Sequence, residues 1–488
     1  MTTPPAPKID AQGLPALEAR LQEDLSFLCW PGKDWVPARE GVSDVVIIGG
    51  GMCGMVAWMA LKTGGIHNMR VLDRSPEGLE GPWVTYARME TLRSPKELTG
   101  PAYGHGALSF QAWYRSQYGT DAWNSLDKIP RPMWMDYLKW YRRVLDIDIE
   151  NGVSVDLVEP EGDLLRLHVS GPSQKTILTR KLVFATGRDG TGEPNIPEFV
   201  KELPRHQWAH SAHEIDFSAL ENKRVAVVGV GASAVDNSAE ALEHGAAEVR
   251  HLIRRKEMPI INKMMGIGSF GFTAGFAELT DEWRWRFMQY SFDTQTPPPH
   301  GSTQRVSGHA NAYFHFGKSV SSTREKNGTV EVGFSDGTSY DTDFVILGTG
   351  FTIDPMSRTE FGEAAGDILL WEDVYTPPID EASSNLGRFP YLNPDFTFLE
   401  KTPGSAPWLG NVYCFNYGAS ASLGKVSGDI PGISEGASWL ARAIAARLYA
   451  EDVAEHWQAM KDYSKPELDG TEWQPSELEI KPKTGAMV

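Results

Sequence analysis

One short stretch of the chain has glycines at a spacing that can hold a phosphate chain. Gly49, Gly51 and Gly54 follow the apolar run VVII and precede a helical pattern. In such a strand–turn–helix unit the first glycine makes the turn, the second lets a pyrophosphate approach the backbone, and the third lets helix and strand pack closely. The helix N-terminus then directs the positive end of its dipole at the phosphates. A tight turn that binds nothing is the alternative.

The same spacing recurs about 180 residues later. Gly229 and Gly231 follow the run VAVV, and Ala234 stands in place of the third glycine, a replacement that this pattern allows. Ser233 lies inside this second loop. The chain is therefore expected to bind two dinucleotides, one on each loop.

The residues that end the next strand differ between the two units. Asp73, followed by Arg74, ends the strand MRVLD after the first loop, and its carboxylate can accept hydrogen bonds from ribose hydroxyls. After the second loop the strand ends in Arg254, Arg255 and Lys256, which suit a ribose 2′-phosphate. We therefore expect FAD on the first loop and NADPH on the second, with a solvated basic strand end as the alternative for the arginines.

The elements that must position these loops indicate an α/β fold with two nested Rossmann-like dinucleotide-binding domains and a helical, aromatic-rich insertion. Alternating segments between residues 153 and 187 predict a three-stranded meander that returns to the first sheet. The expected division of the chain is an N-terminal arm 1–43, FAD-binding parts 44–215 (with the insertion 85–145) and 346–450, an NADPH-binding domain 216–345 with a lid-like insertion 258–320, and a C-terminal tail 451–488.

Composition narrows the class of protein further. A net charge of −18 argues against nucleic acid or an anionic membrane surface as a partner. Three cysteines without a Cys-x-x-Cys pair exclude a disulfide framework and a dithiol centre between sequence neighbours, and fit a reducing cytoplasm. We find neither a signal-peptide pattern nor an apolar run long enough to span a bilayer. We expect a cytoplasmic protein, and a homo-oligomer bridged by the aromatic leading arm is one option.

Further segments carry a family resemblance. LVFATG at 182–187 and FVILGTGF at 344–351, with Thr349 and Gly350 as cofactor contacts, are similar to two strand-ending segments of the class B flavoprotein monooxygenases. HSAHEIDF from His210 and GLEGPWVTYARMETLRSPKELTGP also resemble segments of that family, and the two glycine loops stand in the family's order. The resemblance covers about residues 35–450. The family includes flavin-containing, N-hydroxylating and Baeyer–Villiger monooxygenases.

The resemblance also implies site residues. Trp83 and Arg88 would lie on the segment that runs beside the flavin. Arg93, Ser94 and Lys96 occupy the place where N-hydroxylating members contact substrate and flavin. The segment NVYCFNYGASASLG would return to the flavin ring, with the candidates Asn416, Ser420 and Ser422. Arg93, Lys96 and Asn416 are the expected catalytic donors. A surface lysine at 96 and satisfied loop caps near 416 are the alternatives.

The activity implied by the resemblance is a single-component monooxygenase. NADPH would reduce FAD, O2 would form a C4a-hydroperoxyflavin in a dry pocket, and one oxygen atom would enter a small organic substrate. N- or S-oxygenation or heteroaromatic hydroxylation, for example of a purine derivative, is expected first. Baeyer–Villiger oxygenation of a ketone, and an NADPH oxidase or other FAD/NADPH oxidoreductase without oxygen insertion, are the alternatives. A flavin disulfide reductase would require a redox dithiol near the flavin, and no two cysteines are near each other in the sequence. No metal site is expected, because the spacing of His309 and His315 fits no metal motif.

Overall fold

The computed structural model describes residues 11–172, 175–188 and 190–480, and its largest sheet is built around the first glycine loop. This seven-stranded sheet has the order β3-β2-β1-β6-β5-β4, with β17 pairing to β6. Its strands are β1 (Val42–Ile48), β2 (Met69–Asp73), β3 (Glu150–Asn151), β4 (Ser154–Glu161), β5 (Leu164–Ser170), β6 (Thr176–Phe184) and β17 (Val412–Cys414). β1, β2, β3, β6 and β17 run parallel, and β4, β5 and β6 form the expected antiparallel meander.

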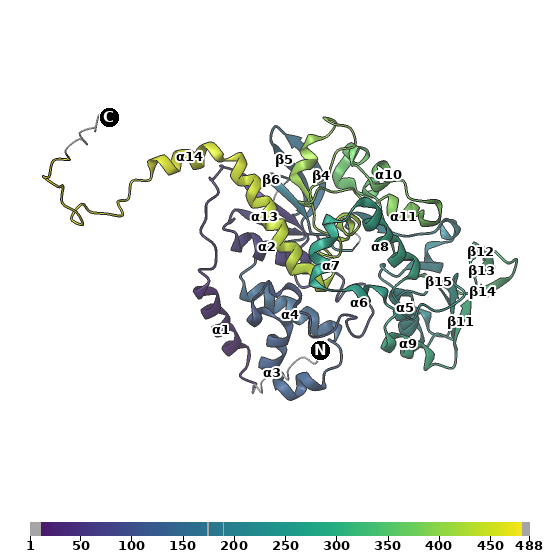
Figure 1. Ribbon diagram of the computed structural model, residues 1–488. Helices are drawn as coiled ribbons and strands as arrows, with labels where there is room; N and C mark the ends of the chain where they lie inside the picture. The colour runs from purple at the N-terminus through teal and green to yellow at the C-terminus, as the bar shows by residue number, and fades with distance from the viewer. Residues whose placement is uncertain (1–10, 173–174, 189, 481–488) are drawn as a thin grey trace, which may run out of the picture.

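Apolar packing explains the centre of this sheet. Val45, Val46 and Ile47 of β1 are completely buried, as expected for a parallel strand covered on both faces. The helix α2 (Met52–Thr63) follows β1 and packs against the long helix α13 (Ile433–Glu451). A late segment of the chain, α13, therefore returns to cover the first β-α-β unit (Figure 1).

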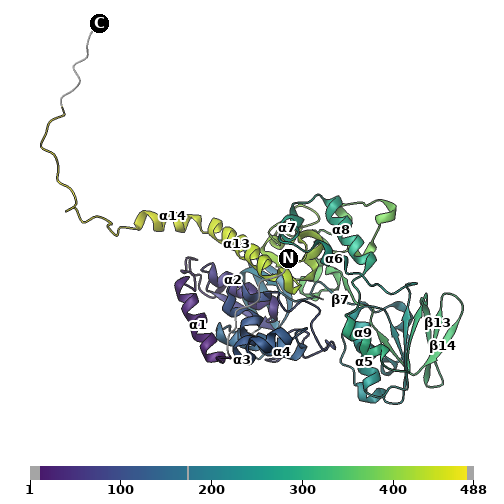
Figure 2. The same ribbon diagram turned by 60° about the horizontal axis from the view of Figure 1, so that its bottom comes forward.

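Helices α1 (Leu14–Phe27), α3 (Phe110–Ser125) and α4 (Arg131–Val144) gather on one side of the first sheet (Figures 1 and 2). Aromatic residues of α3 and α4 form a buried cluster, in which the ring of Phe110 lies 5.5 Å from that of Tyr137 and 5.8 Å from that of Trp134. The aromatic residues of the expected insertion 85–145 thus fill a core. Residues 11–13 precede α1, and the first ten residues of the expected arm lie outside the described part of the chain.

The second glycine loop belongs to a separate five-stranded parallel sheet with the order β11-β10-β9-β15-β8. Its strands are β8 (Trp208–His210), β9 (Arg224–Val228), β10 (Glu248–Ile253), β11 (Ala312–Phe316) and β15 (Phe344–Leu347), and the helices α5 (Ala232–Glu243) and α9 (His300–Ser307) pack together beside it. A small antiparallel sheet joins it, with β12 (Val320–Lys326), β13 (Thr329–Phe334) and β14 (Ser339–Thr342).

The segment expected as a lid, 258–320, divides between two parts of the structure. Its end, α9 and β11, belongs to the second sheet, because β11 pairs in parallel with β10. Its first part forms α6 (Lys263–Ile267), α7 (Phe270–Gly275) and α8 (Asp281–Thr294). Trp285 and Met288 of α8 are buried in a cluster with Ile353 and Trp371, so α8 is packed against the segment that returns to the first sheet.

That returning segment is mostly irregular. Its short helices are α10 (Trp371–Val374), α11 (Ser384–Gly387) and α12 (Ser420–Leu423). The strands β7 (Gly192–Pro194) and β16 (Phe351–Ile353) pair antiparallel on the two connections between the sheets. Single-turn and short 3₁₀ helices complete the description: η1 (Gly100–Ala102), η2 (Gly106–Leu108), η3 (Glu198–Val200), η4 (Arg205–Gln207), η5 (Phe217–Leu220), η6 (Phe276–Glu278), η7 (Pro355–Ser357), η8 (Thr359–Asp367), η9 (Ile379–Glu381), η10 (Pro407–Asn411), η11 (Tyr417–Ala419) and η12 (Ile430–Gly432).

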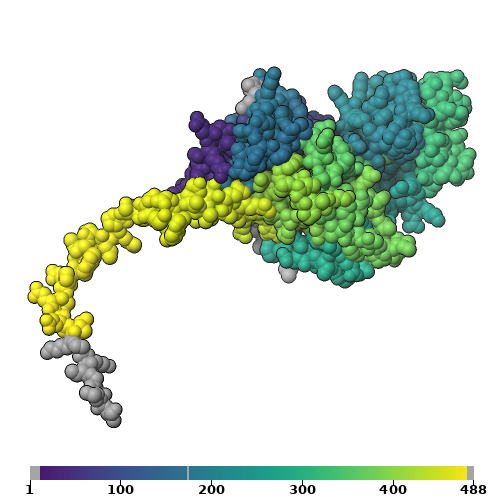
Figure 3. All heavy atoms as spheres, turned by 90° about the horizontal axis from the view of Figure 1, so that it is seen from above, coloured from purple at the N-terminus to yellow at the C-terminus, as the bar shows by residue number. Residues whose placement is uncertain are grey.

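The last helix, α14 (Val453–Asp462), and the residues after it extend away from the body of the molecule (Figures 1 to 3). Large apolar side chains there, such as Trp457 and Met460, are exposed. Among the described residues, no helix combines the length and apolar character needed to cross a membrane.

The expectation of a mixed α/β fold is confirmed.

Candidate active site

The first glycine loop has the tight geometry that its sequence predicts. Gly49 has a φ of +103°, and a Cβ atom added to it would lie 2.5 Å from the Ala185 carbonyl oxygen. A Cβ atom at Gly54 would lie 1.8 Å from the Gly49 carbonyl oxygen. At Gly51 the nearest atom would be 3.9 Å away, on Gly81. Gly49 and Gly54 are therefore required by the fold, whereas Gly51 leaves free space beside the backbone.

The start of α2 faces this space without a side-chain cap. Its N-cap residue is Gly51, and no side chain accepts a hydrogen bond from its first turn. Asp73 holds the loop in place, because its carboxylate accepts hydrogen bonds from the backbone N–H groups of Gly50 and Ser75, both at 2.7 Å. Arg74 beside it is exposed. Uncapped N–H groups at a helix N-terminus form an anion site, so the loop fits a pyrophosphate.

The second loop repeats this arrangement. Gly229 has a φ of +123°, and its added Cβ would lie 2.5 Å from the Gly348 carbonyl oxygen. A Cβ on Gly348 would in turn lie 2.4 Å from the Cβ of Ala234, which explains why the third position here holds a small residue. Gly231 is the N-cap of α5, again without a side-chain cap, and Ser233 lies exposed in the first turn.

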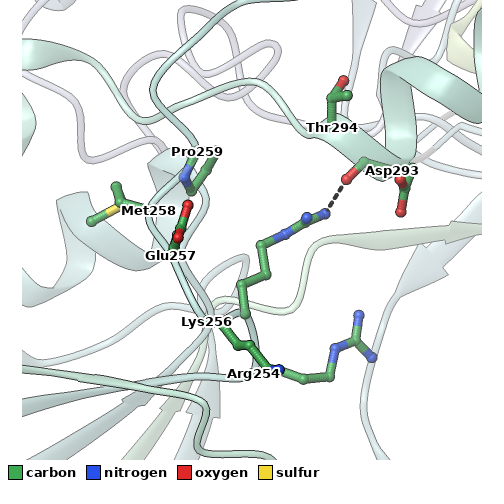
Figure 4. A pocket seen from close by; sticks show the side chains of 8 residues that line it. Arg254, Lys256, Glu257, Met258, Pro259, Asp293 and Thr294 are labelled. Carbon is green, nitrogen blue, oxygen red and sulfur yellow. Dashed lines mark hydrogen bonds between the residues drawn. The ribbon is translucent and has the colours of Figure 1, made fainter.

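A groove of about 700 Å³ lies beyond this loop at the end of β10 (Figure 4). Arg255 lines it and is held in place, since it donates hydrogen bonds to Gln295 Oε1 at 3.0 Å and to the Asp293 carbonyl at 2.5 Å. Gln295 also lies beside Gly231, because its Nε2 would be 3.4 Å from a Cβ added there. Arg254 lines the same groove, and its side chain has no hydrogen bond or ion pair with any described residue. The groove therefore offers a free guanidinium next to the second loop.

Two matching glycines follow the central strands of the sheets. Gly187 after β6 has a φ of +80° and Gly350 after β15 a φ of +78°, and no atom lies within 4 Å of a Cβ added to either. Thr349 Oγ1 donates to the Asn195 carbonyl at 2.5 Å, and the His210 ring contacts the Gly350 carbonyl at 2.9 Å. Burial lowers the pKa of His210 to about 4, so this imidazole is neutral at pH 7.

The side chain of Lys96 lies against the C-terminal end of α3. Its ammonium donates hydrogen bonds to the carbonyls of Trp123, at 2.7 Å, and Leu126, and it lies 5.0 Å from the Trp123 ring centroid. A lysine in this place satisfies carbonyls that the helix end leaves open. This geometry favours a role in holding the helix, and the expected catalytic role stays a prediction.

Asn416 joins the loops that follow β6 and β17. It is fully buried, and its amide donates to the Phe184 carbonyl at 3.3 Å and to Thr186 Oγ1 at 3.2 Å. Its side-chain oxygen accepts hydrogen bonds from Thr191 at 2.5 Å and from the Gly418 N–H at 2.8 Å. Both the nitrogen and the oxygen of its side-chain amide therefore have protein partners.

Ser420 and Ser422, the other candidates in this segment, are also buried and bonded. The Ser420 hydroxyl donates to the Tyr417 carbonyl at 2.7 Å. Ser422 accepts hydrogen bonds from the Trp371 indole at 3.0 Å and the Leu392 N–H at 3.1 Å. These contacts match the alternative of satisfied loop caps.

Trp83 and Arg88 lie on the segment that passes the first loop. Trp83 packs edge-on against Trp134, with ring centroids 6.1 Å apart, and lies next to Gly81. Arg88 reaches the other sheet, because it donates to the carbonyls of Ser211 at 3.4 Å and His213 at 3.1 Å. Arg88 therefore connects the segment after β2 to the loop after β8.

The structure adds Arg188 to the candidates. It follows Gly187 directly, and its guanidinium lies 4.4 Å from the centroid of the Tyr417 ring. Burial and the positive charge of Arg188 lower the pKa of Arg93, so the two guanidinium groups lie within electrostatic range of each other. Sequence reasoning included Arg93 but missed Arg188, although its place directly after Ala-Thr-Gly was a usable signal.

The comparisons with known proteins identify the family. A family model described as pyridine nucleotide-disulphide oxidoreductase matches residues 46–265. A protein from Xanthomonas campestris, named FAD-dependent urate hydroxylase, is 37% identical over 471 residues, which cover 95% of this chain and 99% of the relative. The chain belongs to the class B flavoprotein monooxygenases. It is a flavin-dependent monooxygenase, and the expectation of FAD as a cofactor is confirmed.

Solved structures of this fold carry more than one chemistry. The ornithine N-hydroxylase of Kutzneria sp. 744 matches with a TM-score of 0.61 and 18% identity, over 83% of this chain and 99% of its own. The bacillithiol disulfide reductase of Bacillus cereus matches with a TM-score of 0.56 and 18% identity, over 83% and 99%. Such identities show the fold alone. The three cysteines of this class B monooxygenase are free, and two of them are buried.

Proposed function

We propose that this monooxygenase binds FAD on the loop of Gly49 and Gly51 and NADPH on the loop of Gly229 and Gly231. The free space beside Gly51, the uncapped start of α2 and the open positions at Gly187 and Gly350 support this assignment. When bound, the flavin would accept hydride from the nicotinamide and react with O2. The protein supplies binding and orientation.

The free guanidinium of Arg254 supports NADPH as the preferred nicotinamide. It lies at the end of β10, in the groove beside the second loop, where a ribose 2′-phosphate is recognised in this fold. Arg255 is held by Gln295 and Asp293 and would supply the second cation. Charge-assisted hydrogen bonds from arginine to phosphate are about twice as strong as neutral ones.

We further propose that the seven-stranded and five-stranded sheets belong to two nested dinucleotide-binding domains. Residues 44–215 and 346–450 would form the FAD-binding domain, and residues 216–345 the NADPH-binding domain. Strands β7 and β16, which pair antiparallel, would connect them. Asn416 and Thr186 would hold the flavin-side loops together, because their bond joins the ends of β17 and β6.

We propose a urate-type oxopurine as the substrate and ring hydroxylation as the reaction. The single observation that carries this proposal is the 37% identity to the urate hydroxylase along almost the whole of both chains. The amine hydroxylases among the structural neighbours are far more distant, at 16–18% identity. In the balanced reaction, urate, O2, NADPH and a proton give hydroxylated urate, water and NADP⁺.

A steady-state assay tests this function. The FAD-loaded protein is mixed with NADPH and O2, and NADPH oxidation and peroxide release are followed with urate, ornithine, a thioether or a ketone. We expect urate to stimulate NADPH oxidation and to suppress peroxide. Stimulation by ornithine alone would assign N-hydroxylation, stimulation by the ketone would assign Baeyer–Villiger oxygenation, and stoichiometric peroxide with every compound would assign an NADPH oxidase. Each of these three results would refute the oxopurine proposal.

A further inference from the structure

Arg188 and Arg93 extend from different loops toward the same region. Arg188 follows β6, whose neighbour β17 leads into Tyr417, and the Tyr417 N–H donates to the Gly187 carbonyl at 3.1 Å. Arg93 lies two residues after Thr91, which forms a β-bridge with Pro130. Because the charge of Arg188 acts on Arg93, the loop of Arg93 lies near that of Arg188 and Gly187.

Both arginines are accessible and yet surrounded by protein. Both are exposed residues, so a ligand can reach their charges. Burial lowers the pKa of Arg93, whereas for Arg188 burial is outweighed by the neighbouring Tyr417 and Asp429, which raise the pKa. The Asp236 carboxyl of α5 also acts on Arg93, so Arg93 lies close to the second sheet.

The two guanidinium groups lack an ion-pair partner within the described ranges. The charge of Asp429 reaches both of them, and it is shared with Lys425 at 3.5 Å. Arg93 and Arg188 are thus two exposed cations within electrostatic range of each other, and such a pair attracts an anionic ligand.

We propose that Arg188, together with Arg93, is the anchor that binds the substrate as an anionic oxopurine. This inference rests on the proposed function. Urate is a monoanion at neutral pH, and its charge is spread over coplanar oxygen and nitrogen atoms. A planar guanidinium can pair with two such atoms, and the Tyr417 ring, 4.4 Å from Arg188, fixes the orientation of that plane. The same charges would repel the ammonium group of an amine substrate.

Equilibrium dialysis of oxidised, FAD-loaded enzyme against urate, without NADPH, tests the anchor apart from turnover. The variants are Arg188→Gln and Arg188→Lys, with Arg324→Gln on the exposed strand β12 as the control. A charge-assisted hydrogen bond supports an increase of about 10- to 100-fold in the urate Kd for Arg188→Gln. Arg188→Lys should lie between it and the wild type. Hypoxanthine, which is uncharged at pH 7, should lose little affinity in either variant.

Flavin content and the melting temperature show whether the variants are folded. We expect them to fold, because Arg188 forms no ion pair in the described chain that the substitution would remove. Equal urate binding by wild type and Arg188→Gln would overturn the anchor and leave the proposed function standing. An equal loss of urate and hypoxanthine binding would also overturn it, because shape and not charge would then decide. A wild-type enzyme that does not bind urate would overturn both proposals.

Discussion

Gly51→Val is the most informative perturbation of the first loop. The backbone at Gly51 is extended, with a φ of −74°, and the nearest atom to an added Cβ is 3.9 Å away, so the protein itself has room for the side chain. A bound pyrophosphate would occupy that room. If two charge-assisted hydrogen bonds are lost, FAD binding weakens by about 3–6 kcal/mol, which is roughly a 10²- to 10⁴-fold increase in Kd.

The assay is the ratio of flavin to protein after purification, followed by titration of the apoprotein with FAD. Gly54→Ala is the contrasting variant, because its Cβ would lie 1.8 Å from the Gly49 carbonyl oxygen and should lower the melting temperature of the apoprotein as well. Gly301→Val on α9 is the matched control, since no atom lies within 4 Å of its added Cβ. A fully yellow Gly51→Val protein with an unchanged FAD Kd would refute the assignment of this loop.

Three other predictions concern individual side chains. Arg254→Ala should raise the KM for NADPH about 10- to 100-fold and hardly change that for NADH, and equal effects would reject the 2′-phosphate role. Lys96→Ala should lower the free energy of unfolding by about 1–2 kcal/mol, because the carbonyls at the end of α3 lose the donated hydrogen bonds of Lys96. An unchanged melting temperature together with more peroxide release would instead support the catalytic role of Lys96. Burial lowers the pKa of His251 to about 4. Since the unfolded chain takes up this proton from about pH 6.5 downward, stability should fall as the pH drops from 6.5 to 4, by about 2 kcal/mol per such histidine at pH 5. His251→Phe should flatten that pH dependence, and melting curves of equal slope would contradict it.

The local part of the fold was predictable from the sequence. The run Val45–Ile47 is long enough for a buried parallel strand, and glycines at fixed offsets after it leave one way for the chain to turn into α2. The mixed α/β prediction therefore succeeded. The extent of the expected lid was harder to predict, because whether residues 312–316 join a sheet depends on β10, about 60 residues earlier.

The roles of single polar residues were harder to predict, because distant partners decide them. Ser422 is bonded to Trp371, and Lys96 to carbonyls near residue 125, contacts that no local pattern encodes. Arg188 lies on Tyr417, which is more than 200 residues further along the chain. The sequence showed that these residues could do chemistry, and only the packed structure shows which of their groups remain free.

We propose that this monooxygenase transfers one atom of dioxygen to an anionic oxopurine. The most direct test of this transfer supplies heavy-isotope dioxygen to the enzyme with NADPH and urate, and analyses the product by mass spectrometry. We expect one labelled oxygen atom in each product molecule and one NADPH consumed for each. Unlabelled product, or unchanged urate with the consumed oxygen recovered as peroxide, would contradict it.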